Sequence, residues 1–181
     1  MRSKLLFTIV SDVESPVSTT WKGTKGCVKY IHDTNSAHPK VFTYQVNFPT
    51  TTQSIIEEFR THLRDIRASQ FQSAPTSKTV AIIDAISSKP GTRFPWPEMI
   101  RICREEGAYS LIDAAHCLGQ ELNINLKVSQ PDFWMTVSVG SCFRVSLPSS
   151  KPLQSCHKWL YAKRGCSLLY VQRRCDIYLG S

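Results

Sequence analysis

The chain has 181 residues, of which 41% are hydrophobic and 20% are charged. This balance is ordinary for one folded domain and excludes wholesale disorder. The formal net charge is +8, and the seven cysteines include no C-x-x-C pair, so neither a zinc module nor a disulfide framework is expected.

The start of the chain carries the apolar run Leu-Leu-Phe-Thr-Ile-Val over residues 5–10. This run is too short to span a membrane, and it lacks the flanks of a signal peptide. We predict a buried strand here, followed by a loop rich in Ser and Thr. For the division into domains, residues 1–24 are assigned to an irregular N-terminal segment.

Alternating residues over 41–48 predict a second strand, which Pro49 ends. Ser54 and Glu57 form a capping-box signature, and apolar residues at helical spacing then predict a helix over 54–68. Residues 69–77 are expected to be a polar connector.

The next segments alternate between strand and helix. A continuous apolar run over 79–86 is typical of a central parallel strand, and Pro97 and Gly107 are suited to the start and stop of a helix. Strands are further predicted at 109–114, 132–137 and 166–171. This order predicts an α/β fold with a mostly parallel sheet and helices on both faces.

Three residues at or just beyond predicted strand ends could carry chemistry, because α/β sheets bind ligands there. Asp113 is either a carboxylate that caps a nearby amide or one that holds a cationic ligand such as a protonated pyridine nitrogen. His116 is either a core or surface imidazole or a ring that lies over a second ring. Lys158 is either a solvated lysine or, between His157 and Trp159, a partly buried Schiff-base nucleophile.

Ordered segments of the chain together resemble the class V aminotransferase superfamily, whose members depend on pyridoxal phosphate (PLP) and have fold type I. The closest branch holds cysteine desulfhydrase-like proteins, isopenicillin N epimerase-like proteins and hercynylcysteine sulfoxide lyases. The segments are Asp-Ala-Ile-Ser-Ser-Lys-Pro-Gly-Thr-Arg-Phe-Pro-Trp (84–96), Ile-Asp-Ala-Ala-His-Cys-Leu-Gly-Gln (112–120), Pro-Asp-Phe-Trp (131–134) and Cys-His-Lys-Trp-Leu-Tyr-Ala-Lys-Arg-Gly-Cys-Ser-Leu-Leu-Tyr-Val (156–171).

The resemblance assigns a role to each candidate residue. It implies that Lys158 carries the PLP cofactor and moves the proton at Cα, while Asp113 holds the pyridinium nitrogen. It also implies that His116 packs against the ring or approaches its phenolic oxygen, and that Ser88 lies near that oxygen. Two residues are expected near the phosphate: Ser155 and His157. No metal ligand is expected.

The resemblance also implies a domain division. Residues 25–181 are expected to form part of a PLP-transferase major domain that is incomplete at both ends, as in a truncated fungal-type gene model. Residues 137–154 separate Pro-Asp-Phe-Trp from Cys-His-Lys, and we predict a non-homologous insertion there, of the kind that an unspliced intron leaves.

The function implied is that of a cytoplasmic PLP-dependent enzyme acting on a cysteine-like amino acid. Its chemistry would be that of a C–S lyase (desulfhydrase) or an epimerase, because both pass through a Cα carbanion. The family implies a homodimer and gives no reason to expect a membrane. The alternatives are a catalytically inactive fragment and, less favoured, a nucleic-acid-binding protein that uses the basic residues after Asp132.

Overall fold

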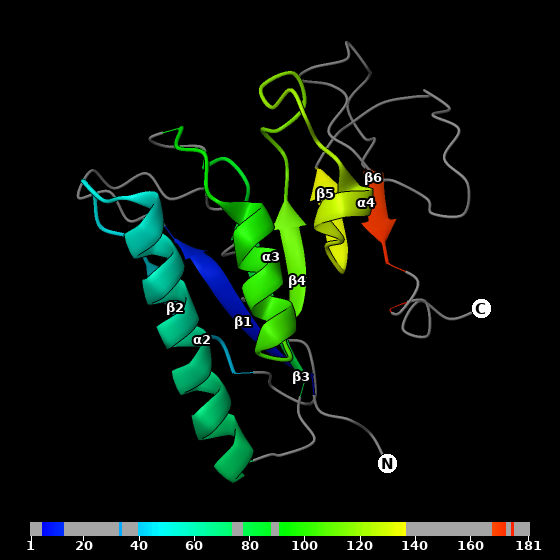
Figure 1. Ribbon diagram of the computed structural model, residues 1–181. Helices are drawn as coiled ribbons and strands as arrows, with labels where there is room; N and C mark the ends of the chain where they lie inside the picture. Colours follow the sequence, from blue (N-terminus) through cyan, green and yellow to red (C-terminus); the bar gives the residue numbers. More distant parts are fainter. Residues whose placement is uncertain are drawn as a thin grey trace.

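The computed structural model describes residues 5–12, 33, 40–73, 78–87, 91–136, 168–172 and 175, and only the backbone of 5–12, 45 and 70–73. Six strands form one sheet in the order β2-β1-β3-β4-β5-β6 (Figure 1). The strands are β1 (Leu5–Asp12), β2 (Thr43–Gln45), β3 (Lys78–Asp84), β4 (Tyr109–Asp113), β5 (Phe133–Thr136) and β6 (Leu168–Val171).

The first five strands pair in parallel, and β6 runs antiparallel to β5. In the β5–β6 pair, Thr136 lies opposite Leu168 and Phe133 lies opposite Val171. The described helices are α2 (Thr52–Ser73), α3 (Trp96–Glu105) and the short α4 (Leu126–Ser129). The predicted fold class, a mostly parallel α/β sheet flanked by helices, is confirmed.

Both long helices, α2 and α3, cover the same face of the sheet (Figure 1). Phe59 and Leu63 of α2 are fully buried against Ile102 of α3 and Ile112 of β4, in one continuous core. This burial is the main source of stability, because each such side chain contributes about 1.5–3 kcal/mol when removed from water. Helices on the second face remain a prediction.

The strand predicted at the start of the chain is confirmed, but the assignment of residues 1–24 to an irregular segment is wrong for 5–12. This run forms β1, which lies between β2 and β3 inside the sheet. β1 pairs in parallel on both of its edges, and parallel strands within a sheet favour such a continuous apolar sequence. The sheet therefore includes residues that precede position 25.

Two predicted boundaries also differ from the structure. The helix begins at Thr52 because Thr51, not Ser54, caps it: the Thr51 Oγ1 accepts a hydrogen bond from the Ser54 N–H at 3.1 Å. It continues to Ser73, into the predicted connector. The strand predicted over 41–48 is reduced to β2, which lies at the edge of the sheet and, among the described strands, pairs only with β1.

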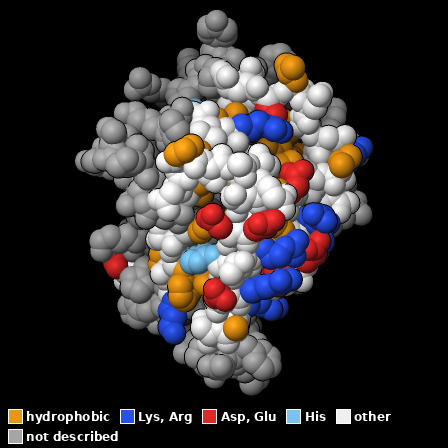
Figure 2. All heavy atoms as spheres, turned by 60° about the vertical axis from the view of Figure 1, so that its left-hand side comes forward, with side chains coloured by type: hydrophobic (Ala, Val, Ile, Leu, Met, Phe, Trp, Pro, Cys, Tyr) orange, Lys and Arg blue, Asp and Glu red, His pale blue; other side chains and the backbone are white. Residues whose placement is uncertain are grey.

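The helix α3 ends as predicted, because Gly107 adopts a φ of 70° just beyond it. On the outer surface, ion pairs join α3 and its end to α2: Arg60 to Glu105 at 2.7 Å and Arg64 to Glu106 at 2.8 Å. Figure 2 shows Lys and Arg side chains interspersed with Asp and Glu over this face. The mixture of signs indicates a solvated helix surface. Among the described helices, none is long and apolar enough to cross a membrane.

Candidate functional site

The carboxyl ends of β3, β4 and β5 meet at one edge of the sheet. Asp84 lies opposite Asp113 in the register, and Asp113 lies opposite Met135. The hydrogen bonds continue just past the strand ends, from the Ala85 N–H to the Asp113 carbonyl at 2.9 Å and from the Ala114 N–H to the Met135 carbonyl at 2.7 Å. The loops that follow β3 and β4 therefore start side by side, as expected for a ligand site of an α/β sheet.

Asp84 and Asp113 project from the sheet face opposite α2 and α3. Ile82 and Leu111 are register partners that pack together apart from the main core, and the two aspartates follow them by two residues. Because side chains alternate between faces along a strand, the carboxylates of Asp84 and Asp113 lie on the same face as that apolar pair. Two carboxylates therefore lie side by side at this edge of the sheet.

The Asp113 carboxylate is oriented by the turn that follows it. Its Oδ1 accepts a hydrogen bond from the Ala115 N–H at 3.0 Å. This contact is the amide capping that one reading of the sequence predicted. It also holds the carboxylate in a fixed direction, which a binding group for a ring nitrogen requires.

The turn after Asp113 carries His116. The Cys117 N–H donates to the Ala114 carbonyl at 3.0 Å, and the Glu121 N–H donates to the Cys117 carbonyl at 2.8 Å. Gly119, with a φ of 75°, allows the chain to reverse between these bonds. The half-buried His116 is thereby placed on the same turn as Asp113, so the structure brings these two predicted site residues together.

The other predicted site residues lie outside the described residues: Ser88, Ser155, His157 and Lys158. The loop that leads to Ser88 is anchored by its neighbour Ser87, whose N–H donates to the Thr92 carbonyl at 2.9 Å. The predicted insertion at 137–154 also lies outside the described residues.

Sequence reasoning missed a set of polar contacts that joins the two loops. Glu121 accepts hydrogen bonds from Arg93 Nε at 3.0 Å and from Trp96 Nε1 at 3.0 Å. Arg93 and Trp96 precede Glu121 by more than 20 residues, so no local pattern relates them. The only sequence signal was that both ends of this contact fall in or beside segments that resemble the family.

The Cys117 thiol lies near Glu121 and is fully buried. Burial and the nearby carboxylates of Glu121 and Asp113 raise its pKa well above the ordinary range. This shift favours the neutral thiol over the thiolate. Within the described ranges, no group of three or more His, Cys, Asp or Glu residues is arranged to hold a metal ion.

The parallel order of the strands and the aspartate at the carboxyl end of β4 define an α/β domain with a candidate ligand site at that end of the sheet. A cysteine desulfurase from Thermococcus onnurineus NA1 superposes with a TM-score of 0.58 over 96% of this chain and 33% of its own, at 12% sequence identity. That likeness concerns the fold alone. No family model matches the chain.

The sequence comparisons identify the branch. The chain is 31% identical over 163 residues to the L-cysteine desulfhydrase-like protein lolT1 of Epichloe uncinata. The aligned segment covers 90% of this chain and 30% of that protein. It is 30% identical over 112 residues to the hercynylcysteine sulfoxide lyase of Schizosaccharomyces pombe, covering 62% and 23%. The resemblance stated from the sequence is confirmed: these proteins are homologues of this chain, which spans less than a third of their length.

Proposed function

We propose that this chain is part of a PLP-dependent enzyme that cleaves the Cβ–S bond of a cysteine-like amino acid. The observation that carries the proposal is the fixed carboxylate of Asp113 at the end of β4, with His116 on the same turn. Lysis is favoured over epimerisation because the homologues are named as L-cysteine desulfhydrase-like proteins and as a sulfoxide lyase.

The described residues fit the cofactor by their chemistry. The pyridine nitrogen of PLP is most useful when protonated, and a protonated nitrogen is a cation. Asp113 and its register neighbour Asp84 supply negative charge on one face of the sheet, which favours a cation there. The imidazole of His116, three residues beyond Asp113, supplies an aromatic surface for a ring.

Each residue would then have a defined task. When bound, PLP supplies an electron sink for the pair left at Cα. Asp113 would keep the proton on the ring nitrogen, and His116 would pack against the ring. Lys158 would bind the cofactor and remove the proton from Cα, after which the electron pair at Cα expels sulfur from Cβ. Returning the proton to the opposite face of Cα would instead give the epimer.

Absorption spectroscopy tests this proposal directly. We expect the purified protein to develop a long-wavelength band when mixed with PLP, and we expect Lys158→Ala to abolish it. The matched control is Lys163→Ala, which removes a lysine in the same basic segment and should retain the band. Asp113→Asn should weaken PLP binding, because a neutral amide cannot hold the charged ring nitrogen. Release of sulfide from L-cysteine would then establish the reaction.

The competing proposal is a catalytically inactive fragment. In that case the sheet would fold without binding the cofactor. A folded wild-type protein that gives no PLP band would support it. The homodimer and the cytoplasmic location that the resemblance implies belong to the first proposal. Both become worth measuring once the PLP band is seen.

A further inference from the structure

Glu121 is a carboxylate that the fold buries at the carboxyl edge of the sheet. Its side chain is 8% exposed, although it lies in a loop. A buried carboxylate is costly unless several donors satisfy it. Here Arg93 donates to Oε1 through both Nε and Nη2, and Trp96 Nε1 donates to Oε2 at 3.0 Å. This set of three residues is called the Glu121 clamp below.

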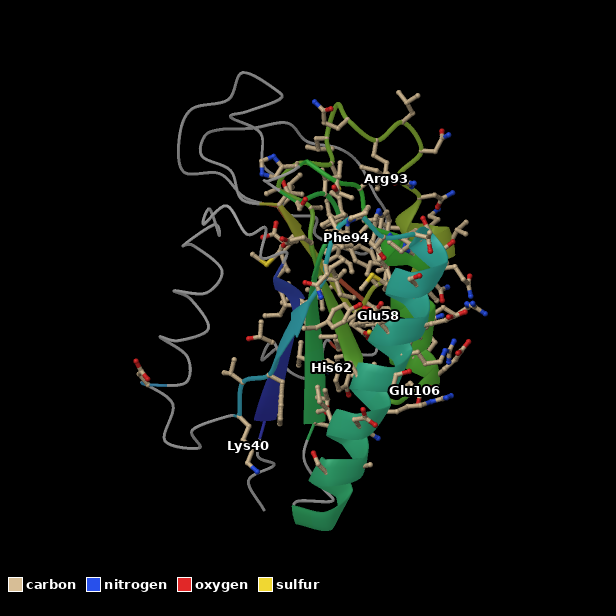
Figure 3. All side chains as sticks on the ribbon, turned by 90° about the vertical axis from the view of Figure 1, so that its left-hand side faces the viewer. Lys40, Glu58, His62, Arg93, Phe94 and Glu106 are labelled. Atoms are coloured by element: carbon tan, nitrogen blue, oxygen red, sulfur yellow. The ribbon has the colours of Figure 1, made fainter. Side chains whose placement is uncertain are left out.

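Of the two donors of the Glu121 clamp, Arg93 belongs to the loop that follows β3 and Trp96 belongs to α3. Ile86 and Arg93 form an antiparallel bridge, and the Phe94 N–H donates to the Ala85 carbonyl at 2.9 Å. Trp96 is the first residue of α3 and is 2% exposed, so its indole is fixed by the core. In Figure 3, Arg93 lies at the loop end of the molecule, well beyond His62. The core therefore holds Trp96 in place, and the backbone bridge to Ile86 holds the backbone of Arg93.

Glu121 itself ends the turn that carries His116. Its own N–H donates to the Cys117 carbonyl at 2.8 Å, and the Cys117 N–H donates to the Ala114 carbonyl at 3.0 Å. Two hydrogen bonds thus connect the Glu121 backbone, through Cys117, to the start of the turn at the end of β4. A shift of Glu121 would move this turn relative to the loop after β3.

The charge of Glu121 is also felt inside the turn. The Cys117 thiol, next to His116 in sequence, has its pKa raised by burial first and then by Glu121, with a smaller contribution from Asp113. Arg93, whose side chain is 61% exposed, opposes that effect. Replacing the carboxylate by a neutral group of the same size would therefore change both the position and the electrostatic surroundings of the turn.

We propose that Glu121 is a positioning residue, whose carboxylate, held by Arg93 and Trp96, fixes the His116 turn against the loop that follows β3. The effect of Glu121 on cofactor binding rests on the proposed PLP function. Its effect on the position of the His116 turn does not depend on that function. Glu121 does not touch the ring in this proposal. It acts through the backbone of the turn and through Cys117.

The test uses three variants of the full chain. Glu121→Gln keeps the size of the side chain and removes its charge, and Arg93→Lys keeps the charge but reduces the number of donors. The control is Glu98→Gln, an exposed glutamate in the first turn of α3, which makes the same chemical change outside the clamp. The unfolding midpoint of each variant is measured first, so that only folded protein is compared.

The first readout is the NMR spectrum of the histidine rings, with His116 assigned through His116→Gln. We expect Glu121→Gln to shift the His116 ring signals and to leave those of His62, on α2, at the wild-type position. Glu98→Gln should shift neither, and Arg93→Lys should shift His116 by less. A merely structural glutamate would lower the unfolding midpoint without moving His116 in the folded protein.

The second readout is the affinity for PLP, measured by absorbance. We expect Glu121→Gln to weaken it roughly tenfold, the low end of what is lost at metal sites when a supporting hydrogen-bond partner is removed. Unchanged His116 signals in folded Glu121→Gln would overturn the positioning role. If the wild-type chain binds no PLP, the proposed function fails, and the His116 signals still decide the role of Glu121.

Discussion

The two ends of the central strands hold their buried carboxylates in different ways. At the amino end, Asp132 is 1% exposed, and its Oδ2 accepts from the Ser110 N–H at 2.9 Å and the Ser110 hydroxyl at 3.0 Å. At the carboxyl end, Glu121 is held by an arginine that is largely exposed. Asp132 is held by the backbone and hydroxyl of one residue on a neighbouring strand, whereas Glu121 is held by side chains of the loop after β3 and of α3.

This difference distinguishes a structural carboxylate at the amino end from the candidate site at the carboxyl end. Asp132 belongs to the Pro-Asp-Phe-Trp segment, yet its contacts join β4 to β5, and its carbonyl accepts from the Gln172 N–H at 2.9 Å, just after β6. Asp132 therefore links three adjacent strands through hydrogen bonds. A residue in a family-like segment need not belong to the site, and here the geometry distinguishes Asp132 from Asp113.

The largest expected effect is at the amino end. Asp132→Ala should lower the free energy of unfolding by about 3 kcal/mol or more, because it leaves the buried N–H and hydroxyl of Ser110 without their acceptor. Chemical denaturation measures this change. Asp65→Ala, an exposed aspartate on α2, is the control and should change stability by less than about 0.5 kcal/mol. Equal losses of unfolding free energy in the two variants would contradict this role of Asp132 in linking the strands.

A smaller effect is expected at the carboxyl end. Trp96→Phe removes the indole donor to Glu121 but keeps most of the buried ring, so the loss of stability should be about 1–2 kcal/mol. Glu121 retains Arg93 as its partner. The proposed difference between the two ends would be contradicted if Trp96→Phe lowered the free energy of unfolding as much as Asp132→Ala in the same denaturation experiment.

The smallest effect concerns pH and lies away from both ends. Burial lowers the pKa of His62, whose Nε2 has no hydrogen-bond partner in the described part of the chain and whose ring centre lies 5.5 Å from that of Tyr44. The unfolded state therefore takes up a proton at a higher pH than the folded state. The contribution of His62 to stability is complete above its unfolded pKa, about 6.5, and is lost as pH falls below it.

Measurements of the unfolding free energy between pH 8 and pH 5 should therefore show a decline that His62→Phe reduces. Variants at Asp132 and Trp96 should keep the wild-type slope, because neither removes this imidazole. A slope that His62→Phe leaves unchanged would assign the pH dependence to other groups.

The sequence predicted most of the sheet for a simple reason: the strands are short apolar runs bounded by turn residues. Residues 79–86 and 109–114 were located to within two residues of β3 and β4. The start of α2 was missed, because Thr51 and Ser54 are both good capping residues and only the structure shows which one accepts the hydrogen bond. The role of residues 5–12 was missed in part, because the division into domains followed the extent of the resemblance.

The site was predictable only where it is local. Asp113 and His116 lie on one turn, so their proximity follows from their spacing. The Glu121 clamp depends on residues that the chain brings back after the whole of α3, and no periodicity indicates such a contact. The roles of Lys158, His157, Ser155 and Ser88 stay predictions.

The antiparallel direction of β6 has a topological consequence for the predicted cofactor lysine. Because Thr136 and Leu168 are opposite one another, the connection over 137–167 leaves and rejoins the sheet at the same edge, beside Met135, the partner of Asp113. Lys158 is thus tethered to the edge that carries Asp113 at both ends of its segment. Closing a loop of doubled length costs only about 0.6 kcal/mol more, so the insertion predicted at 137–154 would lengthen this connection at little cost to the sheet.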